Sequence, residues 1–222
     1  MRFRLDPDGG ELLVAPEIVI VGGYTGRDRE AVAEHILELE RLGVPRPPTV
    51  PAFYAVPPEL LVQSDRVVTT EAATSGEVEA ALIATNGDLY VAVASDHTDR
   101  TAERLDIAVS KRACPKVVGR TAWRLGDVAG SWDGVELRSW IGDDADEPYQ
   151  DGVMAALIPP LELLEAIPWR SRPSSFVLLC GTLPALGGIR PSSRFRGELH
   201  DPAAGRSLSL EYAIETLDFV SA

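Results

Sequence analysis

The sequence predicts an α+β, β-rich fold with few short helices. The chain has 222 residues, a length that suits one domain. Hydrophobic residues make up 45%, enough to bury a real core. The 19 glycines and 17 prolines divide the chain into many short elements, which favours strands and turns over long helices. We therefore expect a single catalytic domain over 1–222, with residues 1–45 as a short N-terminal lobe of strand and helix packed on it.

The N-terminal segment predicts two strands and then a helix. Residues 11–16 and 17–21 are short apolar runs beside Gly-rich turns. From 28 to 42 the apolar positions recur at steps of three or four, which is typical of an amphipathic helix. Gly43 and Pro45 then provide its stop signal.

The rest of the chain predicts mainly strands. Residues 45–58 are too rich in proline for a helix or a central strand, although Phe53 and Tyr54 indicate packing on the body. Residues 157–167 predict a second helix. The expected strands are 66–70, 78–85, 88–95, 135–141, 175–180 and 207–212.

Charge and composition exclude several classes of protein. With 21 basic and 34 acidic residues, the net charge of −13 repels nucleic-acid phosphates and anionic lipid but is compatible with a cation cofactor. Cys114 and Cys180 fit neither a zinc site nor a disulfide framework. No apolar run approaches the roughly 20 residues of a membrane span, and the first ten residues lack a signal-peptide core. We expect a cytoplasmic protein without nucleic-acid or membrane partners.

A hairpin is the most informative feature of the sequence. Asn86-Gly87 is a strong two-residue turn signal between two apolar runs, because both turn residues need positive φ. A simple turn places Thr85 opposite Asp88. Continued along both strands, this register places Glu77 opposite Asp96.

Three carboxylates are therefore expected on one face of the hairpin. Side chains alternate between the two faces of a strand, so Glu77 and Glu79, two residues apart, lie on the same face. Asp96 lies on that face from the opposite strand. Like charges so close are stable only around a cation or in full contact with water. One possibility is a hard divalent cation, for which carboxylate oxygens are suitable ligands. The alternative to a metal site is a charged face in full contact with water. Small residues on the same face would leave room above it: Ala81, Ala92 and Ala94.

These residues resemble the fumarylacetoacetate hydrolase superfamily, whose members share a Glu-x-Glu pair, a later Asp and then a Lys. The matching positions here are Glu77 and Glu79, Asp96, and Lys111, with a shorter connection between the second Glu and the Asp. Residues 180–184, CGTLP, resemble the family's Gly-Thr-Pro element with one residue inserted.

The N-terminal part extends the resemblance over residues 18–215. Val21-Gly22-Gly23-Tyr24 followed by His35 and Glu38 resembles a family motif in which a Gly/Tyr loop precedes a His and a Glu. The distance from Tyr24 to His35 is longer than usual. The Pro and Phe residues that usually follow are matched by Pro48, Pro51 and Phe53.

The resemblance implies a mixed β-sandwich or β-roll like the C-terminal domain of the family, and a homodimer. It also implies Mg²⁺, or Mn²⁺ or Ca²⁺, bound by Glu77, Glu79 and Asp96. His35 with Glu38 would activate water as a general base. Lys111 would hold a substrate carboxylate or steady an oxyanion. Without the resemblance, His35 and Lys111 are ordinary surface residues.

Three further side chains are candidate substrate contacts. They are Tyr24 from the Gly/Tyr loop, Thr182 and Arg100. Thr182 and the Gly181 amide could bind a carboxylate, or Thr182 could be a turn residue. Arg100 could equally be a structural partner of Asp99.

The leading hypothesis is a metal-dependent hydrolase or lyase that cleaves a carbon–carbon bond in a small diketo or oxo acid through a metal-stabilised enolate. One alternative is a decarboxylase, hydratase or isomerase that uses the same site. The other is a non-catalytic protein with a degenerate site.

Overall fold

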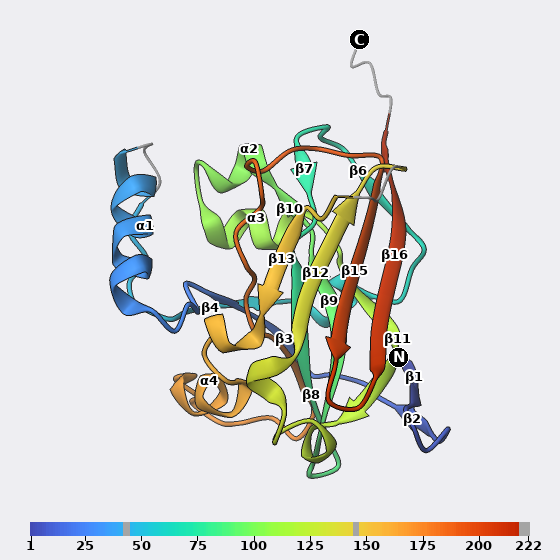
Figure 1. Cartoon of the computed structure of the whole chain (residues 1–222). Coiled ribbons are helices and arrows are strands. Elements are labelled where there is room, and N and C mark those ends of the chain that lie inside the picture. Colours follow the sequence, from blue (N-terminus) through green and yellow to red (C-terminus); the bar gives the residue numbers. More distant parts are fainter. Residues whose placement is uncertain (42–44, 144–146, 218–222) are drawn as a thin grey trace.

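A computed structural model describes residues 1–41, 45–143 and 147–217 of the chain. Strands dominate and the helices are few and mostly short (Figure 1), so the β-rich class expected from the sequence is confirmed. Within these ranges the α-helices are α1 (Arg29–Arg41), α2 (Arg100–Glu103), α3 (Ile107–Ala113) and α4 (Pro160–Ala166). The 3₁₀ turns are η1 (Pro58–Leu60), η2 (Leu125–Asp127), η3 (Trp132–Gly134) and η4 (Met154–Ala156).

The larger sheet is mixed and has nine strands, in the order β2-β1-β11-β9-β8-β14-β3-β4, with β5 pairing with β11. Its strands are β1 (Arg2–Leu5), β2 (Glu11–Leu13), β3 (Ile18–Gly23), β4 (Ala52–Val56), β5 (Leu61–Val62), β8 (Val78–Thr85), β9 (Asp88–Asp96), β11 (Lys116–Arg124) and β14 (Phe176–Leu179). The β8–β9 hairpin lies in the middle of this sheet and not at an edge.

The second sheet has five strands in the order β13-β12-β15-β16-β6, and lies in front of β8 and β9 in Figure 1. Its strands are β6 (Arg66–Thr69), β12 (Glu136–Ile141), β13 (Gln150–Val153), β15 (Arg194–Asp201) and β16 (Arg206–Thr216). A short two-stranded sheet joins β7 (Thr74–Ser75) to β10 (Thr98–Asp99) beside the end of β9.

The large sheet buries both of its faces. Every residue of β8 is buried. Leu82 packs in a core that also contains Leu137 and Phe195 of the five-stranded sheet. Ala81 and Ile83 point the other way, into a second apolar cluster. This two-sided burial explains why β8 is apolar at nearly every position instead of alternating.

The elements agree well with the sequence-based expectations where the apolar pattern was clear. The expected strands of the hairpin are β8 and β9, and the helix expected over 28–42 is α1, although residue 42 lies outside the described residues. The proline-rich segment contains a strand after all, since 52–56 forms β4. This strand lies at the edge of the sheet, where proline is tolerated. Among the longer strands, β11 and β15 were not anticipated, and neither were the short strands β1, β5, β7, β10 and β13.

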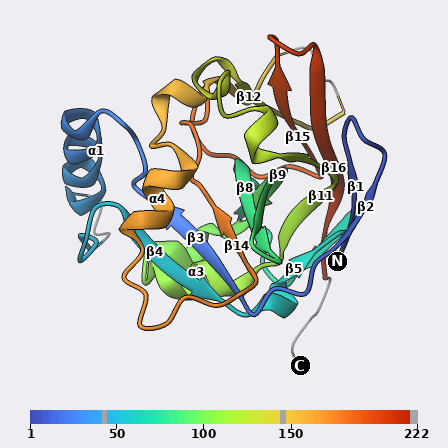
Figure 2. The same ribbon diagram turned by 90° about the horizontal axis from the view of Figure 1, so that it is seen from below.

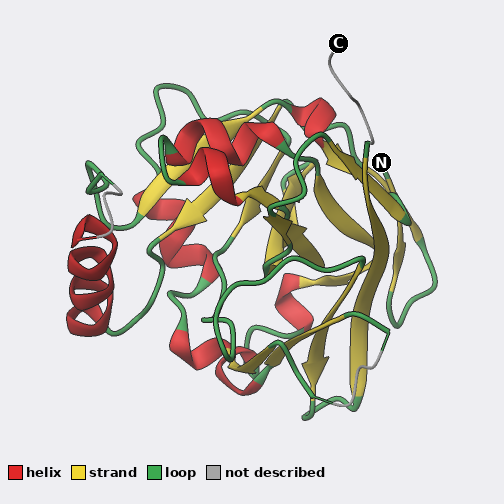
Figure 3. Cartoon of the chain, turned by 90° about the horizontal axis from the view of Figure 1, so that it is seen from above, coloured by secondary structure: helices red, strands yellow, loops and turns green. Residues whose placement is uncertain are grey.

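The N-terminal strands belong to the body of the fold. Strands β1, β2 and β3 belong to the large sheet. Helix α1 stands apart from the body in both views from the ends (Figures 2 and 3), and Ile36 is its buried residue. Among the described residues, the helices are all too short or too polar to cross a membrane.

Candidate active site

The β8–β9 hairpin brings the three predicted carboxylates together. Glu79 pairs with Ala94 in the ladder, and the Asp96 amide donates a hydrogen bond of 2.9 Å to the Glu77 carbonyl. The register expected from the Asn86-Gly87 turn is therefore present. Glu79 is 2% exposed and Asp96 is 0% exposed, so the solvated charged face considered above is wrong.

Asp96 is neutralised by two ammonium groups. Lys111 Nζ lies 2.5 Å from Asp96 Oδ2, and Lys116 Nζ lies 2.8 Å from Asp96 Oδ1. Lys116 faces Asp96 directly across the β9–β11 ladder. These are the only two lysines in the sequence; every other basic residue in the count of 21 is an arginine.

The charges of this cluster support one another. Burial alone would raise the pKa of Asp96, but Lys111 and Lys116 together hold that pKa well below its usual range. Burial would also lower the pKa of Lys111, but Asp96, Glu77 and Glu103 raise it above the ordinary value. Lys111 is therefore a permanent ammonium cation at neutral pH and cannot act as an amine nucleophile or base.

Glu79 is fixed by the backbone that follows β14. The Gly181 amide donates a hydrogen bond of 2.6 Å to Glu79 Oε2. Gly181 has φ +93°, and a Cβ there would lie 1.7 Å from Thr25 Oγ1, so only glycine fits. Burial first, and the neighbouring Asp96 second, raise the pKa of Glu79 well above its ordinary value.

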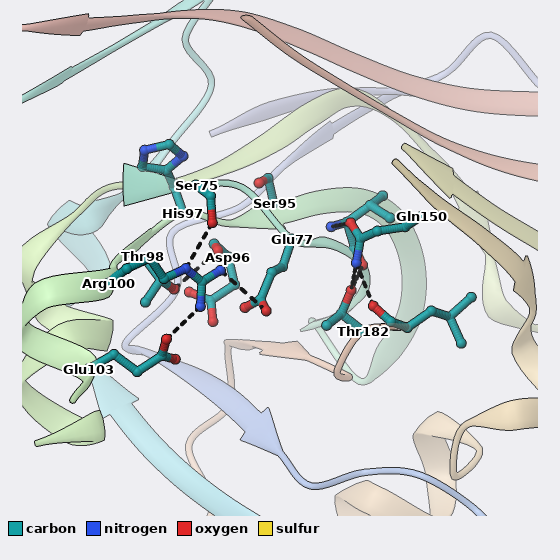
Figure 4. Close-up of polar contacts among 12 residues, drawn as sticks. Ser75, Glu77, Ser95, Asp96, His97, Thr98, Arg100, Glu103, Gln150 and Thr182 are labelled. Carbon is teal, nitrogen blue, oxygen red and sulfur yellow. Dashed lines mark hydrogen bonds and ion pairs between the residues drawn. The ribbon is translucent and has the colours of Figure 1, made fainter. Parts of the chain in front are cut away.

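Arg100 lies between Glu77 and Glu103 and contacts both (Figure 4). It donates to Ser75 Oγ (2.8 Å) and Glu103 Oε2 (2.7 Å), and its Nη2 lies 3.3 Å from Glu77 Oε1. The expected partnership with Asp99 is wrong, because Asp99 instead caps α2 by accepting from two backbone amides. Arg100 thus holds Glu77 in place.

Thr182 supports the strand that carries the two glutamates. Its hydroxyl donates to the Val78 carbonyl (2.6 Å) and accepts from Gln150 Nε2 (2.7 Å). Gln150 Oε1 accepts from the Val78 amide (2.9 Å). The Thr182 hydroxyl and the Gly181 amide both already donate hydrogen bonds within the protein. In this arrangement neither has a free donor for a substrate carboxylate, which is the role expected from the sequence.

Two tyrosines border the cluster. Tyr24 has φ +56° and is half-buried, and burial followed by the charge of Glu103 raises its pKa. Burial and then Tyr24 raise the pKa of Tyr54 to about 12. Both phenols are therefore neutral hydrogen-bond donors near Lys111.

His35 and Glu38 are not brought to the carboxylates. Their side chains are 61% and 69% exposed on α1, and His35 Nδ1 lies 3.9 Å from Glu38 Oε2. The predicted neighbouring pair exists, but within the described residues its contacts do not extend to the cluster. Helix α1 exposes both side chains to solvent, and its buried residue is Ile36.

His97 points away from the carboxylates (Figure 4). Its ring nitrogens lie 3.0 Å from the Tyr212 hydroxyl and 3.0 Å from Thr74 Oγ1. Burial first, and then the charge of Lys116, lower its pKa to about 4. His97 is thus a neutral residue of the protein interior.

The donor set fits a hard divalent ion. Among the described residues, no group of three His, Cys, Asp or Glu side chains is arranged to hold a metal ion. The reason is visible in the distances, since Lys111 Nζ lies within 4 Å of Asp96, Glu77 and Glu103. Three carboxylates already surround the Lys111 ammonium, and carboxylate oxygens are the type of ligand that Mg²⁺ and Ca²⁺ prefer.

The alanines of the hairpin do not leave the open space expected above them. Ala81, Ala92 and Ala94 are all 0% exposed, because the second apolar cluster covers them. The most exposed carboxylate near Lys111 is that of Glu103, at 25%.

Sequence reasoning missed Lys116, Glu103 and Gln150. Lys116 could have been found, since it is the only lysine besides Lys111 in an arginine-rich chain. No sequence signal marks Gln150, which reaches β8 from the five-stranded sheet across 72 residues of chain.

The fold and site define a β-rich protein with a buried carboxylate and ammonium cluster at the end of its central hairpin. The family model described as "Protein of unknown function (DUF2848)" matches residues 22–212, so the chain belongs to that family. No curated protein matches the sequence.

Solved structures share the fold at low sequence identity. The apo form of 2-keto-3-deoxy-D-arabinonate dehydratase has a TM-score of 0.64 at 14% identity, covering 92% of this chain and 74% of its own. A 4-oxalocrotonate decarboxylase from Pseudomonas putida G7, complexed with calcium and acetate, has a TM-score of 0.55 at 12% identity, covering 91% and 79%. Cg1458 has a TM-score of 0.62 at 14% identity, covering 92% and 78%. Identities this low establish the fold alone.

Proposed function

We propose that this protein is a metal-dependent lyase of the fumarylacetoacetate hydrolase superfamily that acts on a small oxo acid. The observation that carries the proposal is the placement of Glu77, Glu79 and Asp96 on one face of the hairpin, where Glu77 and Asp96 already hold the Lys111 ammonium. The residues of the sequence resemblance and the fold shared with a dehydratase and a decarboxylase support the same assignment.

Glu77, Glu79 and Asp96 would hold the ion, with Mg²⁺ as the first candidate and Mn²⁺ or Ca²⁺ as alternatives. When bound, it would polarise a carbonyl oxygen of the substrate as a Lewis acid. The calcium in the decarboxylase structure is consistent with a divalent ion in this fold.

The chain's own residues supply the remaining requirements. Lys111 is a buried cation that would bind a substrate carboxylate and offset negative charge on the neighbouring oxygen. Tyr24 would donate a hydrogen bond from its neutral phenol. Arg100 and Lys116 fix Glu77 and Asp96, and so orient the carboxylates before any ligand arrives. The bound ion together with Lys111 would give the site the local positive charge that lets an acidic protein accept an anion.

A lyase is preferred over a hydrolase because the proposed water-activating pair is not in the cluster. His35 and Glu38 are both exposed on α1. Elimination of water or carbon dioxide from an oxo acid needs no activated water, and the two enzymes of similar fold carry the names dehydratase and decarboxylase. We further propose that the protein acts as a homodimer.

Calorimetric titration with Mg²⁺ and Mn²⁺ tests the metal site. We expect binding to the wild type, loss of affinity of about tenfold or more in Glu77→Gln, and no change in Glu215→Gln, an exposed carboxylate paired with Arg66. Oxalate, which resembles an oxo acid carboxylate with its adjacent oxygen, should bind only with the metal present. A folded wild type that binds neither ion at millimolar concentration would refute the proposal.

Turnover is then measured with a panel of small oxo acids, following loss of substrate absorbance and release of carbon dioxide. We expect activity that depends on the divalent ion and falls in Glu77→Gln. Metal binding without turnover of any oxo acid would leave a non-catalytic binding protein as the better description.

A further inference from the structure

The two lysines of the chain share one carboxylate but are held very differently. Lys116 lies on β11 within the large sheet, is 0% exposed and faces Asp96 in the ladder. Besides its ion pair with Asp96, its ammonium donates a hydrogen bond of 2.6 Å to the His97 carbonyl. A strand in the middle of a sheet and two short contacts leave this ammonium no other position.

Lys111 is held less tightly. It lies on the seven-residue helix α3, whose outer face is exposed at Val109. Its one short contact is with Asp96 Oδ2, at 2.5 Å. Its distances to Thr98 Oγ1, Glu77 and Glu103 are 3.4, 3.6 and 3.8 Å. Lys111 therefore has a second carboxylate within reach if it leaves Asp96.

We infer that Lys111 is an exchangeable counter-ion, an inference that rests on the metal site proposed above. On divalent-ion binding the Lys111 ammonium gives up Asp96 Oδ2 and moves toward Glu103, while Lys116 keeps Asp96 Oδ1. Buried carboxylates are strongly destabilising without a nearby cation. An exchange of one cation for another keeps them neutralised at every stage, so the hairpin stays folded with or without metal.

Glu103 is the receiving group in this exchange. It is the more exposed of the carboxylates around Lys111, and Arg100 already anchors it at 2.7 Å. Movement of Lys111 to Glu103 shifts the ammonium toward the accessible side of the cluster. There it can meet the carboxylate of an incoming oxo acid. Lys111 thus acts as the counter-ion of Asp96 when no metal ion is bound. When the metal ion is bound, it acts as a binding group for the substrate carboxylate.

Lysine-selective NMR tests the exchange directly. Because the chain contains two lysines, protein labelled with ¹³Cε-lysine gives two side-chain signals. Lys111→Arg identifies them by the loss of one. During titration with diamagnetic Mg²⁺ we expect the Lys111 signal to shift progressively to saturation and the Lys116 signal to stay nearly fixed. Equal shifts of both, or an unmoved Lys111 signal at saturating Mg²⁺, would overturn the exchange.

Calorimetry supplies the second measurement. Removing a competing unit charge a few ångströms away in Lys111→Met should tighten Mg²⁺ binding by about tenfold or more. Arg112→Met, on the same helix and bonded to the Ala55 carbonyl, is the matched control and should bind as the wild type does. Affinity in Lys111→Met that is equal or weaker would contradict the inference.

A double-mutant cycle separates exchange from simple charge removal. Glu103→Gln should weaken Mg²⁺ binding about threefold when Lys111 is present, because the ammonium loses its destination. The same change in the Lys111→Met background should have a clearly smaller effect, and equal effects in both backgrounds would count against the receiving role.

If neither the wild type nor Lys111→Met binds Mg²⁺, the proposed function fails together with the exchange. If Mg²⁺ binds but the Lys111 signal does not move, only the exchange fails.

Discussion

Lys116 on β11 lies directly opposite Asp96 on β9, and its Nζ is 2.8 Å from Asp96 Oδ1. Both side chains are fully buried. Lys111 completes the neutralisation from the neighbouring helix. A carboxylate held between two ammonium groups in the middle of a sheet is both a structural element and the centre of the proposed site.

Replacing Asp96 should therefore strongly destabilise the fold. Asp96→Asn leaves Lys116 without its counter-ion and Lys111 with only its longer contacts to Glu77 and Glu103. We expect a loss of about 3–5 kcal/mol in the free energy of unfolding. Urea unfolding measures this loss. Asp65→Asn removes an exposed carboxylate paired with Arg120 and should cost less than about 0.5 kcal/mol. Equal unfolding midpoints for the two variants would contradict the role of the buried cluster.

Substitution of Gly181 tests the backbone that fixes Glu79. Gly181→Ala combines left-handed backbone strain of about 1–2 kcal/mol with a clash against Thr25, so we expect about 3 kcal/mol in total. Gly188→Ala is the matched control, because Gly188 also has positive φ but a Cβ there meets nothing within 4 Å. Thermal or urea unfolding measures the loss of unfolding free energy in each variant, and the difference between the two losses is the contribution of the clash with Thr25. A Gly188→Ala loss as large as that of Gly181→Ala would refute this account.

Gln150 should act as a positioning residue for the two glutamates. Its amide makes four hydrogen bonds, two of them to Val78 and Thr182. Gln150→Leu leaves these partners unsatisfied, and we expect a loss of about 3 kcal/mol together with weaker Mg²⁺ binding. Gln63→Leu removes another hydrogen-bonded amide, far from β8, and should leave Mg²⁺ affinity unchanged. Unaltered Mg²⁺ binding in folded Gln150→Leu would show that β8 keeps its position without it.

The neutral buried state of His97 predicts a pH dependence of stability. Its pKa is about 4 in the folded protein against 6.5 for the ordinary group. Between these values the unfolded chain binds a proton that the folded chain does not, so stability falls as the pH is lowered from 6.5 to 4, by at most about 3 kcal/mol. Above pH 6.5 the contribution is absent.

Urea unfolding of the wild type and His97→Gln between pH 8 and 4 measures this term. The difference in unfolding free energy between the two proteins should shift in favour of the variant as the pH falls. Parallel curves for His97→Gln would instead show that His97 does not stay neutral.

The exposed pair on α1 distinguishes the two classes of reaction. Because His35 and Glu38 do not contact the cluster, His35→Ala should leave Mg²⁺ affinity and unfolding free energy within experimental error of the wild type. Retained turnover would favour a decarboxylase or dehydratase. Loss of turnover with unchanged Mg²⁺ binding would instead favour the hydrolytic reaction, with α1 supplying the base.

Local sequence patterns determined much of the hairpin. The Asn86-Gly87 turn needs positive φ at both residues, and this requirement sets the register that brings Glu77 and Glu79 opposite the Asp96 strand. Helix α1 follows from its apolar periodicity in the same local way. Such features depend on neighbouring residues only, so the sequence alone was sufficient for them.

Only the tertiary structure decided what surrounds the carboxylates. Lys116 reaches Asp96 from β11, and Gln150 reaches the Val78 amide at the start of β8 from the five-stranded sheet. The second apolar cluster closes the space above the hairpin alanines. Burial converts three acidic residues from a solvated face into a cluster that needs cations, because charge is costly to remove from water without a partner. Sequence spacing determines the register of a hairpin. It does not determine how deeply the hairpin is buried, or which distant residues neutralise its charges.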